Sequence, residues 1–181
     1  NAFNLAQKMS FGNINTDLIA GLPTDTFESF KNTINEIVAI SPQSVTVHSL
    51  SMKRASTLTF AGFSPEIDMG IIADKMVDYA YNTLTNNMIL PYYMYRQSKT
   101  VGNLENVGYA KKGFEGLYNV YIMDETHTIL ACGASGSTKL KNQKTGKIKR
   151  IFNYKYPYEY INRFSEQLNR KNEIVTFYGE M

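Results

Sequence analysis

Residues 15–23 read NTDLIAGLP, and this stretch decides how the chain begins to fold. Its apolar part is typical of a strand, and Pro23, which has no N–H to give to a neighbouring strand, ends it. Asp17 lies inside this apolar strand, where a carboxylate is costly unless another group pairs with it. Because alternate residues of a strand share one face, Asp17, Ile19 and Gly21 are expected side by side.

The segment that follows predicts a helix and then a second strand. Asp25 and Glu28 have the spacing of a capping box, and apolar residues recur behind them at helical spacing. Ser41-Pro42 ends the helix, because the residue before a proline avoids the helical region. Residues 44–50, SVTVHSL, read as a strand. Residues 13–50 therefore predict a strand–helix–strand unit whose two strands are parallel.

The rest of the chain predicts one long helix followed mostly by antiparallel strands. Ser64-Pro65-Glu66 supplies the cap, the proline and the acid that open a helix. From residue 88 onward the hydrophobic period changes to two, which is typical of strands. Strands are expected over residues 88–97, 117–124, 128–131, 138–141 and 174–178 and in a segment ending at 154, with a helix from about residue 157. The predicted fold class is α/β, or α+β overall.

The composition excludes several classes of protein. With 181 residues, 43% of them hydrophobic and 19% charged, the chain suits a globular domain and not a disordered segment. A net charge of +3 is too small to indicate a nucleic-acid partner, and no apolar run is long enough to cross a membrane. The single Cys132 excludes an intramolecular disulfide and predicts a cytoplasmic location. With only two histidines besides, the chain is expected to hold no metal by itself.

Three polar positions are candidate ligand contacts, and each has an ordinary alternative. The position of Asp17 is typical of a carboxylate that accepts hydrogen bonds from sugar hydroxyls, with Ile19 and Gly21 as a flat wall for a base. The alternative is a partly hydrated residue bonded to backbone or lysine. His48 lies near the end of its strand, where ligand sites of α/β folds gather, or it is a hydrogen-bonded structural residue. Lys53-Arg54 can clamp carboxylates, or it is a solvated basic pair.

Three further segments carry weaker signals. Residues 102–109, bracketed by glycines and rich in donors and acceptors, suit an active-site loop or any tight connection. Gly133-x-x-Gly136 with its neighbouring serines is superficially like a phosphate cradle, but the lysine and hydroxyl of a P-loop do not follow it. The basic stretch 139–150 either contacts RNA or forms a solvated strand pair.

Several motifs in a fixed order resemble one family along nearly the whole chain. They are NTDLIAGLP at 15–23, ESF at 28–30, SP followed by VTV at 41–47, HSLSMKRAS at 48–56, YYMYRQ at 92–97 and NLENVGY at 103–109. Together they are similar to the late barrel of radical S-adenosylmethionine enzymes. The resemblance is specifically to oxygen-independent coproporphyrinogen III dehydrogenases of the Z-type branch.

The resemblance implies which residues bind S-adenosylmethionine. Asp17 matches the cofactor-binding acid of the family, and Ile19 with Gly21 match the adenine-side wall of the same strand. Ser51 falls where the backbone after the next strand contacts the cofactor. Ser137, in the small-residue loop, aligns more loosely with another such contact. These five residues are the predicted cofactor contacts.

One departure from the family pattern concerns the iron–sulfur cluster. The family binds a 4Fe–4S cluster through a Cys-x₃-Cys-x₂-Cys loop, and this sequence has a single cysteine. A complete (β/α)₈ barrel takes about 250 residues. We therefore expect a C-terminal portion of a larger enzyme, with residues 1–63 as the end of a TIM-like barrel and residues 64–181 as a helix with antiparallel strands. Such a fragment is expected to be inactive alone, with neither the cofactor nor the cluster bound to it.

The parent enzyme implied by the resemblance converts porphyrinogen propionates to vinyl groups by oxidative decarboxylation in haem biosynthesis. Lys53, Arg54 and Arg96 are the candidate contacts for the substrate carboxylates. Val107 stands where the classical branch has a glutamine that serves a second cofactor molecule, which argues against a second site. The alternative function is a haem chaperone of the same superfamily, with His48 or a methionine contacting haem. A truncated barrel has an unpaired edge, so a homodimer through that edge is also expected.

Overall fold

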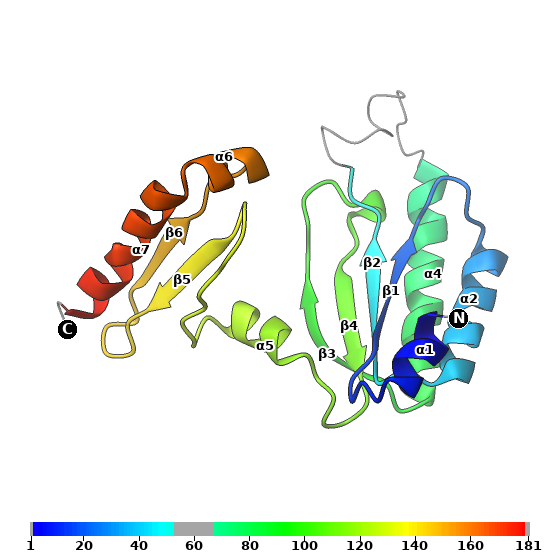
Figure 1. Cartoon of the computed structure of the whole chain (residues 1–181). Coiled ribbons are helices and arrows are strands. Elements are labelled where there is room, and N and C mark those ends of the chain that lie inside the picture. Colours follow the sequence, from blue (N-terminus) through cyan, green and yellow to red (C-terminus); the bar gives the residue numbers. More distant parts are fainter. Residues whose placement is uncertain (1, 53–66, 180–181) are drawn as a thin grey trace. The chain divides into compact units, whose positions relative to one another are not determined.

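The structure is a computed structural model that describes residues 2–52 and 67–179 (Figure 1). The chain divides into two compact units, Asn1–Gly116 and Leu117–Met181. The boundary predicted between residues 63 and 64 lies outside the described residues. The long helix α4 (Ile67–Asn86) belongs to the first unit and packs against its strands.

The first unit is built around a four-stranded mixed sheet with the strand order β1-β2-β4-β3. The strands are β1 (Asn15–Ala20), β2 (Ser44–Ser49), β3 (Leu90–Tyr95) and β4 (Asn106–Ala110). β1 and β2 are parallel, whereas β4 is antiparallel to both β2 and β3. The predicted strand–helix–strand unit with a parallel pair is therefore confirmed. The short helix α1 (Ala2–Lys8) precedes the sheet, and the 3-10 turn η1 (Val101–Asn103) connects β3 to β4.

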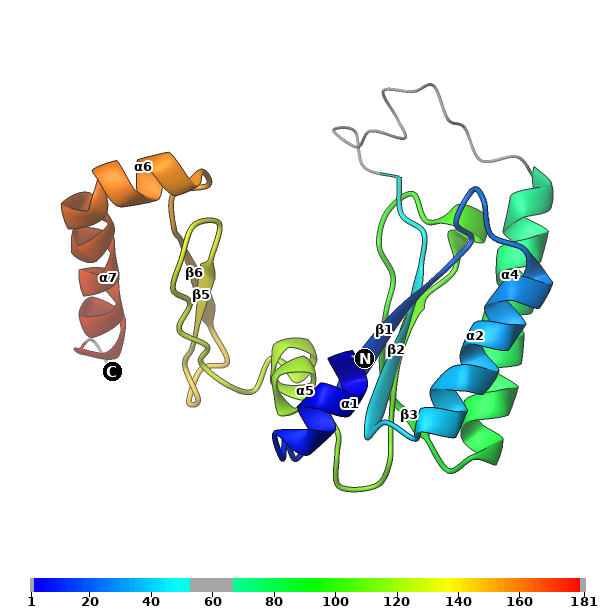
Figure 2. The same ribbon diagram turned by 45° about the vertical axis from the view of Figure 1, so that its right-hand side comes forward.

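Helices α2 (Phe27–Ile40) and α4 cover one face of this sheet, as Figures 1 and 2 show. The core between them is apolar and consists of Ala20, Phe30, Ile34, Val45, Val47, Met76, Ala80, Leu84, Ile89 and Tyr109. Burial alternates along β1, so that Ala20 is buried while Asp17 and Ile19 are exposed. We call the opposite side, which carries Asn15, Asp17, Ile19, Thr46 and His48, the open face.

The ends of α2 are fixed by local hydrogen bonds. Thr26 is the cap, because its Oγ1 accepts a hydrogen bond from the Ser29 N–H at 3.2 Å. The capping box predicted for Asp25 and Glu28 is therefore wrong by one residue. Asp25 instead accepts a hydrogen bond from the Thr26 N–H at 3.0 Å. The helix ends before Ser41, as the following proline predicts.

The second unit combines a two-stranded antiparallel sheet with three helices. The sheet pairs β5 (Ser137–Lys141) with β6 (Ile148–Phe152), and the helices are α5 (Leu117–Asp124), α6 (Pro157–Asn162) and α7 (Phe164–Gly179). The predicted strand at 138–141 and the helix from residue 157 are confirmed. A buried polar network joins the layers: Gln167 Nε2 donates to Asn153 Oδ1 at 2.8 Å, and Gln167 Oε1 accepts from the Tyr154 N–H at 3.1 Å.

Four predictions about strands are wrong. Residues 117–124 form helix α5, because the Lys139 ammonium donates to the carbonyls of Tyr121 and Ile122 near the end of this helix, at 3.3 Å each. Residues 174–178 continue helix α7, since a helix already formed extends at low cost. Residues 128–131 make only an isolated bridge between Ile129 and Lys139. Residues 106–110, expected in a loop, form the central strand β4.

Candidate functional site

The carboxyl ends of β1 and β2 bring together several of the predicted site residues. The parallel register pairs Asp17 with Thr46 and Ile19 with His48, which puts all four side chains on the open face. Ser51 follows β2, and its Oγ donates a hydrogen bond to the Ser98 carbonyl at 3.0 Å. Ligand sites of parallel sheets gather at this edge.

A hollow of about 210 Å³ lies at this edge of the sheet. Its lining consists of Ile19, His48, Ser49, Leu50, Ser51, Gln97 and Asn106. Ile19 leaves 42% of its surface exposed and gives the hollow an apolar wall. Drug-sized ligands usually occupy about 300–1,000 Å³, so this hollow can hold only part of a molecule of that size.

Asp17 does not line the hollow itself, but it lies next to His48, which does. Asn15 Nδ2 donates a hydrogen bond to Asp17 Oδ1 at 2.7 Å, and His48 Nε2 lies 3.8 Å from the same oxygen. The other carboxylate oxygen has no hydrogen-bond partner among the described residues. The side chain is 63% exposed, so that oxygen can accept hydrogen bonds from a ligand in the open face.

An aromatic ring closes one side of the open face. Tyr93 lies across Gly108, and a Cβ added to Gly108 would overlap this ring and stand 2.9 Å from its Cζ. Burial raises the pKa of the Tyr93 hydroxyl, and the Tyr92 phenol adds to the rise, while a hydrogen bond with Thr46 opposes it. The Tyr93 phenol therefore stays neutral near pH 7 and presents an O–H group beside Thr46.

Asn106 is a site residue that the sequence reasoning missed. Its side chain is buried, its Oδ1 accepts a hydrogen bond from the Ser49 N–H at 2.9 Å, and it lines the hollow. It thereby fixes the backbone where β2 ends. The available signal was an asparagine within the glycine-bracketed segment 102–109, but only the strand pairing shows which backbone group it holds.

The other predicted residues are placed differently. Gly21 has a positive φ of 81° and turns over Ala73, where an added Cβ would stand 3.1 Å from the Ala73 Cβ, and it does not line the hollow. Ser137 lies in β5 of the second unit. Arg96 forms an ion pair with Glu105. Lys53 and Arg54 lie outside the described residues.

Two kinds of feature are absent from residues 2–52 and 67–179. In this part of the chain, no group of three or more His, Cys, Asp or Glu side chains could hold a metal ion. No helix in the same part combines the length and the apolar character needed to cross a membrane.

The chain is similar in sequence to two curated proteins, and no family model matches it. It is 37% identical over 169 residues to the oxygen-independent coproporphyrinogen-III oxidase-like protein HemZ of Bacillus subtilis, covering 93% of this chain and 34% of that protein. It is 26% identical over 161 residues to the heme chaperone HemW of Haemophilus influenzae, covering 88% of this chain and 38% of that protein. The chain therefore spans little more than a third of the length of these relatives.

A solved structure has the same fold. It is the coproporphyrinogen III oxidase HemN from Escherichia coli, described as a radical SAM enzyme, with a TM-score of 0.58 and 17% sequence identity. The match covers 91% of this chain and 37% of that structure. The predicted α/β fold is confirmed, and it is the fold of a part of that structure.

Proposed function

We propose, from the correspondence of this chain to a C-terminal part of a HemN- and HemZ-like radical S-adenosylmethionine enzyme, that its open face forms one wall of the cofactor chamber. The observation that carries the proposal is the pairing of an apolar wall with an accepting carboxylate. Ile19 exposes its side chain toward the hollow, and Asp17 keeps one oxygen unpaired among the described residues.

The residues present fit the adenosine half of the cofactor. An aliphatic side chain gives a nucleobase a flat apolar contact, and a carboxylate accepts hydrogen bonds from ribose hydroxyls. Asn15 orients the Asp17 carboxylate by a hydrogen bond to Oδ1, and His48 Nε2 lies 3.8 Å from the same oxygen. The chain's single cysteine cannot supply three cluster ligands, so we assign the 4Fe–4S cluster to residues outside this chain. S-adenosylmethionine, once bound and cleaved reductively, supplies the radical that takes hydrogen from substrate propionates.

Binding of S-adenosylmethionine to the 181-residue chain tests the proposal. We expect weak binding, seen as fast-exchange amide shifts in an ¹⁵N-labelled sample that are confined to β1, β2 and residues 50–52. Asp17→Asn should weaken the binding, because an amide offers one acceptor where the carboxylate offers two. Asp74→Asn, which changes an exposed acid on α4, is the matched control and should bind as the parent chain does. If the amide shifts and the affinity were the same in the parent chain and in Asp17→Asn, the assignment of Asp17 to the cofactor-binding wall would be wrong.

The substrate proposed for the complete enzyme is a porphyrinogen whose propionates become vinyl groups. Arg96 is the one of the three predicted carboxylate contacts that lies within the described residues, and its side chain is 52% exposed. Its present partner is Glu105, so a propionate would have to replace or share that contact. In the complete enzyme, Arg96→Lys should raise the KM for substrate more than it lowers kcat, because Lys cannot form the bidentate pair.

Haem binding is a second candidate, which the similarity to a heme chaperone favours. His48 lines the hollow with 30% of its side chain exposed, as an axial ligand to haem iron would require. A haem titration should then shift the Soret band. His48→Ala should abolish the shift, while His127→Ala, the other histidine of the chain, should leave it unchanged. A titration without a Soret shift would exclude this candidate.

The proposed partner at the edge of the sheet is another strand. β1 is the outermost strand of the sheet, with β2 on one side only. In the 181-residue chain we expect this edge to pair with a second copy, giving a dimer in light scattering at high concentration. Ile19→Lys places a charge beside the edge and should shift the equilibrium toward monomer, whereas a strictly monomeric parent chain would contradict the proposal.

A further inference from the structure

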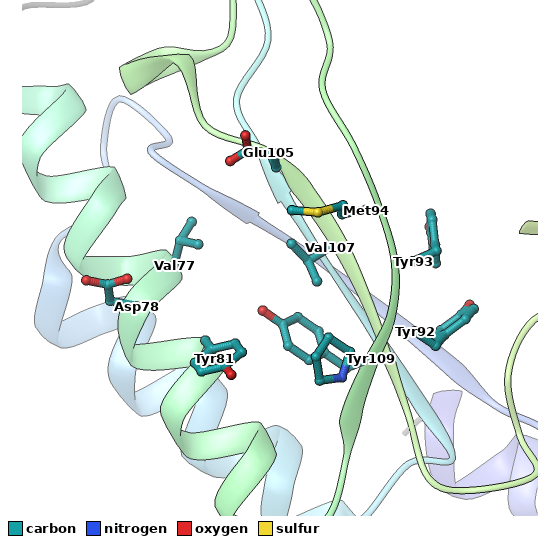
Figure 3. A pocket seen from close by; sticks show the side chains of 10 residues that line it. Val77, Asp78, Tyr81, Tyr92, Tyr93, Met94, Glu105, Val107 and Tyr109 are labelled. Atoms are coloured by element: carbon teal, nitrogen blue, oxygen red, sulfur yellow. The ribbon is translucent and has the colours of Figure 1, made fainter. Parts of the chain in front are cut away.

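A second, larger cavity lies on the other side of the sheet from the open face. It has a volume of about 490 Å³ and opens between α4 and the strands β3 and β4 (Figure 3). That volume falls within the range of small-molecule sites. Val77, Met94 and Val107 form an apolar wall. Because Val107 and Tyr109 point toward the helix layer while Asp17 and Ile19 point to the open face, this cavity is separate from the hollow described above.

The cavity contains a tyrosine hydroxyl that is open to the cavity and has no hydrogen-bond partner in the part of the chain that the structure describes. Tyr109 is 1% exposed, lines the cavity, and extends its ring from β4 toward α4 in Figure 3. No hydrogen bond to its Oη occurs within the part of the chain that the structure describes. Burial raises the pKa of this phenol to about 12, so it remains an O–H donor at pH 7. The hydroxyl can therefore donate a hydrogen bond into the cavity, to water or to a ligand that carries an acceptor.

The charged groups that line the cavity are both acids. Glu105 is compensated by its ion pair with Arg96. Asp78, on the exposed side of α4, has no ion-pair partner among residues 2–52 and 67–179. The described part of the lining therefore carries a net negative charge, and the Tyr81 ring belongs to the same lining. Carboxylates and aromatic faces both attract organic cations.

We propose that this cavity binds an organic ammonium ion with a flat apolar body and a hydrogen-bond acceptor at the opposite end. The apolar body contacts Val77, Met94 and Val107, and the acceptor receives the Tyr109 hydroxyl. The ammonium group lies near Asp78 at the opening. The acceptor and the ammonium group of the ligand bind the Tyr109 hydroxyl and the Asp78 carboxylate, which have no hydrogen-bond or ion-pair partner within the described chain.

The probes are 4-methoxyphenyl alkylammonium ions with two to four methylene groups, titrated into the ¹⁵N-labelled 181-residue chain. We expect saturable amide shifts in β3, β4 and the middle of α4 for at least one chain length. The matched 4-methoxyphenyl alkanoates, which replace the ammonium by a carboxylate, should cause no shifts there. Equal shifts from the ammonium and the carboxylate series, or no saturable shift from any ammonium probe, would overturn the proposal.

Two substitutions test the polar contacts separately. Tyr109→Phe removes the hydroxyl and keeps the ring, and it should weaken the best ammonium probe about three- to tenfold. Asp78→Asn should weaken the same probe, and its effect should shrink in high salt. Tyr118→Phe and Asp74→Asn are the controls, since neither residue lines the cavity. Unchanged affinity in both Tyr109→Phe and Asp78→Asn would show that the probe binds elsewhere and would refute the assignment.

Discussion

Gly108→Ala is the sharpest test of how the open face is packed. Gly108 lies in β4, between β2 and β3, and the Tyr93 ring rests on it from the neighbouring strand. A methyl group at this position would overlap the ring carbons Cδ1 and Cε1 and stand 2.9 Å from Cζ. An overlap of this size cannot be absorbed by shifts of a few tenths of an ångström, so the ring must leave its place.

The change in stability expected for Gly108→Ala follows from two opposing effects. Adding a methyl group to a packed site costs about 1–3 kcal/mol. Replacing glycine within a strand returns about 0.5–1 kcal/mol, because alanine loses less backbone freedom on folding. The net destabilisation expected for Gly108→Ala is therefore about 1 kcal/mol, and at most about 2.5 kcal/mol. In a Tyr93→Ala background the obstacle is absent, so the same substitution should cost nothing or stabilise slightly.

Native-state hydrogen exchange measures this effect within the first unit alone. The slowest-exchanging amides of β2 and β4 report the free energy of opening that unit. Gly108→Ala should lower it, and the double substitution with Tyr93→Ala should give a coupling energy of about 1–3 kcal/mol, which is the cost of the overlap alone. Gly12→Ala, with nothing within 4 Å of the added Cβ, is the control. Unchanged protection in Gly108→Ala, or equal losses in both backgrounds, would refute the packing.

Three further predictions concern other parts of the two units. Thr26→Ala removes the cap of α2 and should cost the first unit about 1 kcal/mol, whereas Thr26→Ser should not. Arg163 lowers the pKa of the Glu166 carboxyl to about 2 from 4.5, so protection in the second unit should fall as pH drops from about 4.5 toward 2, and Glu166→Gln should remove that dependence. Lys139→Met leaves two carbonyls without their donor, so Cα shifts of residues 117–124 should lose helical character; unchanged shifts would contradict this account of α5.

The first part of the fold follows from local signals that agree with one another. In residues 13–50 the apolar periods, the proline stops and the helix cap all indicate the same elements, and the structure contains them. A short crossover helix then leaves parallel pairing as the natural arrangement. Even the error at the cap is small, because Thr26 and Asp25 are both residues that cap helices.

The central strand β4 could not be read locally, since its sequence resembles a loop. Asn106 and Gly108 are both unfavourable in strands. Each is required by a contact with another strand: Asn106 holds the Ser49 N–H, and Gly108 leaves room for Tyr93. Such requirements become visible only when β2 and β3 are already beside β4. A glycine in a strand interior is thus a sign of close approach here and not of a turn.

The opposite error occurred where β-branched and aromatic residues lie in helices. Residues 117–124 and 174–178 have strand-like composition, and an isolated pattern favours a strand. α5 depends instead on Lys139, which lies in β5 and is 2% exposed. The end of α7 depends on the helix that precedes it. In α5 a residue remote in sequence overrides the local preference for a strand, and in α7 the preceding helical turns do so.

The polarity of the open face is the remaining argument for a chamber. Parallel strands are usually covered on both faces, and their sequences are continuous apolar runs. In β1 and β2, by contrast, polar and apolar side chains alternate along the strand. On the open face, Asn15 donates to Asp17 and to Thr46 Oγ1, the latter at 3.2 Å, and His48 lies 3.8 Å from Asp17. A second apolar layer packed here would bury these groups without enough partners, at several kcal/mol each. The face is therefore compatible with water or a polar ligand, and Asp17→Leu should weaken ligand binding without lowering the opening free energy of the first unit.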